Sequence, residues 1–171
     1  VLSMLILAAL PTQAHAAPNA SYSDPDLPFS VTWNPDQFAL ATVATGGILL
    51  SQEAMVLMIG PDTHPTAQDC VDHRVQIDMI DTPLLYVRMG QIDPTPEPVG
   101  LAAEQAAAYA WPDGIAHLAW FGCIPIGEHQ NIILRLLAST TNWERAVNTF
   151  APVLDEMDYA PLPAATPSAT I

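Results

Sequence analysis

The chain has 171 residues, half of them apolar, which suffices for one domain with a genuine hydrophobic core. Its 18 acidic residues are matched by only four arginines and no lysine, which gives a formal net charge of −14. This charge argues against a nucleic-acid partner, because such binding depends on cations that neutralise phosphates, and it disfavours adhesion to an anionic membrane surface. The acidity is consistent with solubility through like-charge repulsion or with adaptation to high salt.

The first segment of the chain has the order of a signal peptide. An apolar run over residues 1–10 is followed by Pro11 and then by the small-x-small sequence Ala14-His15-Ala16. We therefore predict a signal peptide over residues 1–16, truncated at its N-terminus and cleaved after Ala16. The run is shorter than the roughly 20 residues that a spanning helix needs, so no stable membrane insertion is expected after cleavage.

The mature chain begins with a polar, extended lead-in over residues 17–27, followed by a single domain over residues 28–159. Phe29, Val31 and Trp33 alternate with polar residues, which predicts a half-buried strand. The next predicted strands cover residues 38–43, 48–51 and 54–59.

Gly60-Pro61-Asp62 predicts a turn that ends the third of these strands. Apolar residues then recur every four positions at Val71, Val75 and Met79, as in a helix, although the last part also alternates like a strand. We expect a helix from Pro65 through most of this stretch.

Two signals compete in the alanine-rich segment 101–111. Intrinsic propensity favours a helix there, yet the turn sequence at 111–114 and the apolar segment 115–123 follow directly. A hairpin accounts for this turn better than a helix does, so a strand is predicted over at least residues 106–111. A further strand is predicted over residues 131–138.

The end of the domain predicts a helix. Thr141-Asn142-Trp143-Glu144 has the pattern of a capping box, and apolar residues then recur at three to four positions up to about Met157. Residues 160–171 are rich in proline, alanine and threonine, which predicts a disordered tail or a linker.

Together these elements predict an α+β domain: an antiparallel sheet of about six strands covered by one or two helices, including the C-terminal amphipathic helix. The strand and turn over residues 29–38 (FSVTWNPDQF), the run of hairpins and the closing strand and helix resemble the PsbP/Mog1-type α/β/α sandwich of secreted bacterial proteins. The resemblance implies that Cys70 and Cys123 take the places of a cysteine after the first helix and one on a central strand. Members of this fold serve as accessory subunits, binding modules and proteins of unknown role, so no functional residue is implied.

Cys70 and Cys123 are the only thiols, and export would place them in an oxidising compartment, so we predict a disulfide between them. A metal-binding pair and a nucleophilic thiol are the alternatives, but neither cysteine belongs to a C-x-x-C sequence.

One group of side chains has the chemistry of a divalent metal site. Asp62, His64, Asp69, Asp72 and His73 lie close together in the sequence and offer carboxylate and imidazole ligands. Their spacing matches no EF-hand or zinc signature, and acidic residues at the start of a helix also suit its dipole without any ligand. The alternative is therefore a solvated helix start.

The chain contains no nucleophile elbow, zinc-protease motif or phosphate-binding loop, and its carboxylates are too numerous to single out a catalytic pair. We expect an exported, non-enzymatic binding or accessory module without a cofactor, whose partner is another extracytoplasmic protein or a small ligand. The alternative is a binder of a small ligand or a divalent cation, and an extracellular hydrolase is less favoured.

Overall fold

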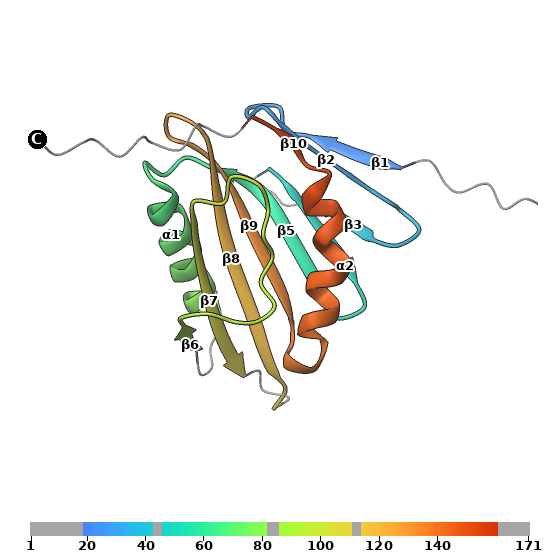
Figure 1. Cartoon of the computed structure of the whole chain (residues 1–171), viewed down its shortest axis with the longest axis vertical. Helices are drawn as coiled ribbons and strands as arrows, with labels where there is room; N and C mark the ends of the chain where they lie inside the picture. The colour runs from blue at the N-terminus through green and yellow to red at the C-terminus, as the bar shows by residue number, and fades with distance from the viewer. Residues whose placement is uncertain (1–18, 43–45, 82–85, 111–113, 161–171) are drawn as a thin grey trace, which may run out of the picture.

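The computed structural model describes residues 19–42, 46–81, 86–110 and 114–160 (Figure 1). The larger sheet consists of β3 (Ala39–Thr42), β4 (Ile48–Gln52), β5 (Met55–Asp62), β6 (Tyr86–Met89), β7 (Ala103–Ala110), β8 (Ala116–Gly127) and β9 (Gln130–Ser139). The smaller sheet consists of β1 (Ala20–Ser23), β2 (Phe29–Trp33) and β10 (Asp158–Tyr159). The helices are α1 (Ala67–Asp81), the short 3₁₀ helix η1 (Thr140–Asn142) and α2 (Trp143–Asp155).

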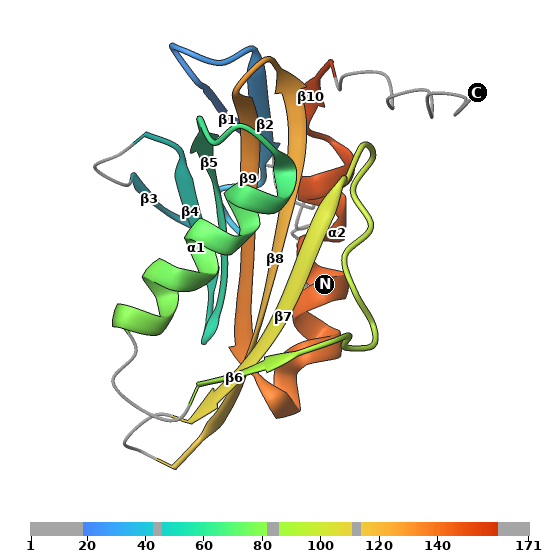
Figure 2. The ribbon, with the colours of Figure 1, turned by 90° about the vertical axis from the view of Figure 1, so that its left-hand side faces the viewer.

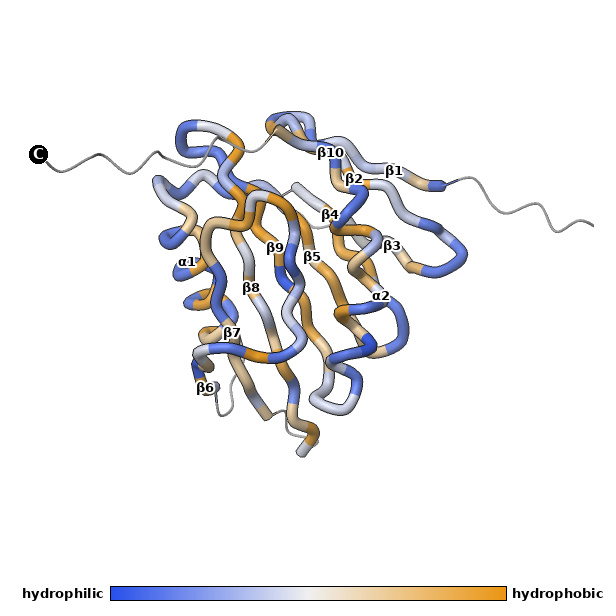
Figure 3. Tube along the Cα trace, viewed as in Figure 1, coloured by the Kyte–Doolittle hydropathy of each residue, from blue (hydrophilic) through white to orange (hydrophobic). Residues whose placement is uncertain are grey.

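The predicted α+β class is confirmed, with every strand pair antiparallel. The larger sheet has seven strands in the order β3-β4-β5-β9-β8-β7-β6, and the smaller sheet has the order β1-β2-β10. Figure 2 shows the larger sheet between two layers, with α1 on one face and α2 on the other. The hydropathy colouring of Figure 3 is most apolar along the central strands β5 and β9, as expected for strands buried on both faces.

Successive side chains of the strands point to opposite faces of the larger sheet, so the interior is divided into two cores. The first core lies between the larger sheet, α2 and the smaller sheet, and it buries Trp33, Trp120 and Phe150. Phe38 stacks on Phe150 at 5.1 Å between ring centroids, which fixes the helix against the chain that precedes β3. The predicted amphipathic pattern of α2 is thus confirmed, although the helix ends at Asp155.

The second core lies under α1 and contains the disulfide. Val71 and Val75 of α1 are fully buried against the sheet, and the predicted bond joins Cys70 of α1 to Cys123 of β8, with Cα atoms 6.4 Å apart. The helix prediction from the four-residue period is confirmed, since α1 spans Ala67–Asp81.

The turn predicted at Gly60-Pro61-Asp62 is wrong, because β5 continues to Asp62 in register with β9. The neighbour on the other side, β4, pairs only as far as Ile59. Pro61 therefore lies where β5 has one partner strand, and a residue without an N–H group is tolerated at such an edge.

The predicted capping box at residues 141–144 is also wrong. Thr141 belongs to η1, its hydroxyl lies 3.1 Å from that of Ser139, and no side chain caps α2. A side-chain cap forms instead at α1, where the Asp69 amide donates to the Thr66 hydroxyl at 3.1 Å and that hydroxyl donates to the Asp69 carboxylate at 2.7 Å.

The alanine-rich segment forms the strand β7, as the hairpin argument predicted. The extended lead-in contributes β1, which pairs with β2, while β6 and β10 were not predicted. The predicted signal peptide with its cleavage at Ala16, and all of the tail beyond Ala160, lie outside the described residues. No helix in the described parts of the chain is long and apolar enough to cross a membrane.

Candidate functional site

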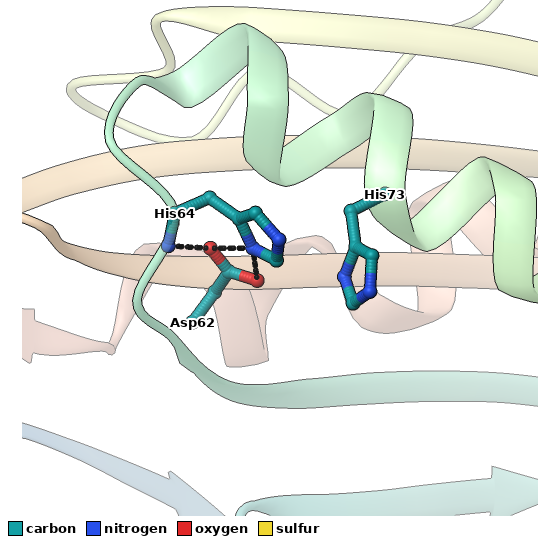
Figure 4. A group of neighbouring side chains, drawn as sticks. All are labelled: Asp62, His64 and His73. Atoms are coloured by element: carbon teal, nitrogen blue, oxygen red, sulfur yellow. Dashed lines mark hydrogen bonds and ion pairs between the residues drawn. The ribbon is translucent and has the colours of Figure 1, made fainter.

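Three of the five predicted metal-binding side chains meet beside the end of β5. One ligand atom from each of Asp62, His64 and His73 lies within 4.8 Å of the other two. Figure 4 shows the His73 side chain extending from α1 toward the imidazole of His64, with the Asp62 carboxylate on the strand side. The two imidazole centroids are 4.1 Å apart. The cluster is thus assembled from a strand end, the loop after it and a helix.

The backbone around His64 is fixed by neighbours on two sides. Asp62 pairs with Asn131 in the β5–β9 ladder, and the amide side chain of Asn131 donates to the His64 carbonyl at 2.8 Å. The His64 amide donates to Asp62 Oδ1 at 2.8 Å. Asn131 is almost fully buried, so this positioning contact is shielded from water. Asn131 was not predicted as a site residue, since its one signal in the sequence is a polar side chain at the start of an apolar strand.

The carboxylate of Asp62 also sets the tautomer of His64. Nδ1 of His64 lies 2.9 and 3.1 Å from the two carboxylate oxygens. An ionised carboxylate only accepts hydrogen bonds, so Nδ1 carries the proton and the neutral imidazole keeps its lone pair on Nε2. An ion held by both Asp62 and His64 would replace this proton and bind Nδ1, the imidazole nitrogen that faces the carboxylate.

Two imidazoles and one carboxylate are the ligand set of zinc and related transition metals, and they do not suit calcium or magnesium, which take mostly oxygen ligands. Ligand atoms about 2.1 Å from one ion lie at most about 4.2 Å apart. The observed spread of up to 4.8 Å exceeds this limit, so the side chains must draw closer together to hold an ion. His73 is exposed, so a small rotation of its side chain closes the set.

A cavity of about 190 Å³ adjoins the cluster, between α1 and the end of β5. Asp62 and His73 belong to its wall, so an ion at the cluster would border it. On the strand side, Gly47 has φ +88°, and a Cβ there would approach the Ile59 carbonyl oxygen to 2.4 Å. Only glycine allows the chain before β4 to pass this close to β5. Residues of the cavity wall are Gly46, Met58, Gly60, Pro61, Asp62, His73, Arg74, Ile77 and Ile133.

The other two predicted ligands lie apart from the cluster. The carboxylate of Asp69 accepts the Thr66 hydroxyl at the start of α1, and Asp72 lies 3.8 Å from Arg88 of β6. For Asp69 the structure corresponds to the alternative that the sequence left open, an acidic helix start. The cysteines are joined to one another and offer no thiolate.

No family model matches the chain, and no curated protein matches it either.

Proposed function

We propose that the protein is an exported, non-enzymatic binding module that holds one divalent transition metal ion through His64, His73 and Asp62. The observation that carries the proposal is the convergence of two imidazoles and a carboxylate, with one ligand atom from each within 4.8 Å of the other two. A formal charge of −14 adds a field that favours cations over anions at the surface.

Export is supported by the disulfide between Cys70 and Cys123, since such bonds persist mainly in oxidising compartments. The apolar start of the chain supports it independently. A disulfide-closed domain with a metal site at one sheet end fits a module that captures or carries an ion outside the cytoplasm.

The test is a calorimetric titration of the domain with Zn²⁺, Co²⁺, Ni²⁺, Ca²⁺ and Mg²⁺. We expect one equivalent of each transition metal to bind, and no binding of Ca²⁺ or Mg²⁺ at the same concentrations. His73→Ala should lower Zn²⁺ affinity more than about 100-fold, because it removes a direct ligand. Asp62→Asn should lower it by a similar factor, because the variant keeps the shape of the side chain and loses the carboxylate ligand.

The matched control is His129→Asn. His129 is exposed in the β8–β9 turn, and its φ of +54° is one that asparagine accepts. This variant should bind Zn²⁺ as the wild type does. Equal Zn²⁺ affinities of His73→Ala and His129→Asn, or no transition-metal binding at all, would overturn the proposal.

A further inference from the structure

We propose that the metal-loaded site binds a small monocarboxylate with a compact aromatic or branched body. This inference rests on the proposed metal binding. The carboxylate would occupy the open coordination position of the ion, and the hydrocarbon body would fill the neighbouring cavity. The sequence left a small ligand as a general alternative, and the cavity supports a place and a chemical class for it.

The coordination of the proposed ion leaves a position for a further ligand. Three protein ligands leave one position of a tetrahedral zinc site open. Asp62 and His73 both border the cavity of about 190 Å³, so the cavity lies directly beside the proposed ion. A ligand in the cavity therefore has access to the open position.

Apart from Arg74, the wall of the cavity is apolar away from the proposed ion. Met58 and Ile133 are at most 8% exposed and belong to the core under α1, and Ile77 of α1 closes the helix side. Arg74 adds a permanent positive charge to the same wall. A ligand with one anionic end and a hydrocarbon body matches both parts of this wall.

The volume of the cavity limits the size of the ligand. An apolar protein cavity of about 150 Å³ is known to hold benzene, which has six heavy atoms. A cavity of about 190 Å³ therefore accepts a body of that size with one small substituent. Benzoate fits this description, with its ring in the cavity and its carboxylate toward the ion. A straight eight-carbon chain is too long.

The charges make binding of the carboxylate depend on the metal. Without an ion, the carboxylate of Asp62 at the cavity wall repels an anionic ligand. A divalent ion reverses the local charge. Metal and carboxylate should consequently strengthen each other's binding by the same factor, which for coupled sites is commonly about 5- to 150-fold.

The experiment loads the domain with Co²⁺, whose visible absorption depends on the number and geometry of its ligands. Benzoate should change this spectrum saturably and raise Co²⁺ affinity by about 5- to 150-fold. Acetate, which has the carboxylate without the body, should act only at much higher concentration, and octanoate should act no better than acetate. Protein without metal should bind none of the three.

Two substitutions on one helix separate the cavity from the metal site. Ile77→Trp should fill the cavity, so that Co²⁺ still binds and the response to benzoate is lost. Ile80→Trp is the matched control, because Ile80 is 75% exposed on the same helix, and it should respond as the wild type does. If Ile77→Trp does not fold, Gly60→Val narrows the cavity from β5, where an added Cβ would lie 3.7 Å from the Gly46 carbonyl oxygen, its nearest neighbour beyond the adjacent residues.

Three results overturn the inference. Co²⁺ binding with a spectrum that benzoate leaves unchanged would contradict the carboxylate site and leave the metal site standing. An undiminished benzoate response in the folded cavity-filling variant would show that the carboxylate binds elsewhere. A failure to bind Co²⁺ would contradict the metal site itself and the carboxylate site with it.

Discussion

The fold alters the titration of Tyr86 in β6. Its ring lies nearly parallel to that of Tyr109, with centroids 6.0 Å apart, and its hydroxyl is buried beneath α1. Burial, followed by the negative charge of Asp78, raises the pKa of Tyr86 to about 12. Asp78 is itself buried and forms an ion pair of 2.7 Å with Arg135.

The raised pKa of Tyr86 predicts alkaline destabilisation. An unfolded tyrosine titrates near 10, so the neutral form is favoured in the folded state, and this contribution is complete below about pH 10. It is lost as the pH rises from about 10 to about 12. We expect the free energy of unfolding to fall over this window, and Tyr86→Phe to make the fall shallower in denaturant titrations. Superimposable pH profiles of variant and wild type would contradict the assignment.

For single residues, the site shows what could be predicted from the sequence. It identified the side chains with metal-binding chemistry, because Asp62, His64 and His73 are distinctive in type and close in the chain. It did not separate them from Asp69 and Asp72. That separation depends on local contacts, since the Thr66 hydroxyl binds Asp69 and the position of β6 brings Arg88 near Asp72.

Among the elements, α1 connects the stability of the fold to the proposed site. The helix carries His73 three residues after Cys70, whose disulfide fixes it to β8. The bond closes a loop between residues 53 apart in sequence. In the chain-entropy model a loop of this length stabilises the folded state by about 4 kcal/mol.

We predict that the double variant Cys70→Ala/Cys123→Ala loses about 2–4 kcal/mol of unfolding free energy in urea titrations. Its Zn²⁺ affinity should fall as well, because α1 no longer holds His73 as firmly toward His64. Wild-type protein reduced in solution should show the same two losses. Unchanged stability in both preparations would mean that packing of α1 alone fixes the helix.

The type of each element followed from the sequence wherever periodicity and turn chemistry agreed, as in β2 and α2. Propensity failed for β7, where alanines form a strand because Ala107 and Ala103 lie on the face that α1 covers and small side chains allow its approach. The capping pattern failed before α2, because η1 takes up the residues that would have formed the box. Strand β6 has no local signal, and its pairing with β7 defines it.

For the whole molecule, the charge is nearly all of one sign. The described residues contain four ion pairs, one of which involves His64, and they leave most carboxylates without a cation. Repulsion among these carboxylates therefore opposes the compact state.

Salt should consequently stabilise the protein. We expect the thermal midpoint to rise as NaCl increases from about 0.02 to 0.3 M, because the screening length falls from roughly 20 Å to less than 10 Å over that range. The same ionic strength supplied by another monovalent salt should give the same rise, which distinguishes screening from binding of a specific ion. A flat or falling midpoint would show that the few ion pairs outweigh the repulsion.

The division into two sheets is the feature of the whole molecule that the sequence did not indicate. The smaller sheet is completed by β10, two residues that follow α2 and pair with β2 across most of the chain length. So short a strand carries no period, and only the position of α2 brings it beside β2.

The smaller sheet has a mechanical consequence when the domain is pulled from its two ends. The described region enters through β1 and leaves through β10, and these strands lie on opposite sides of β2. Both run antiparallel to β2, so tension between Asn19 and Ala160 pulls their ladders in shear along the strands. Two residue pairs join β10 to β2, whereas four join β1 to β2, so β10 should separate from β2 first. The smaller sheet would thus yield under load while the seven-stranded sheet, with the residues that meet at the end of β5, remains intact.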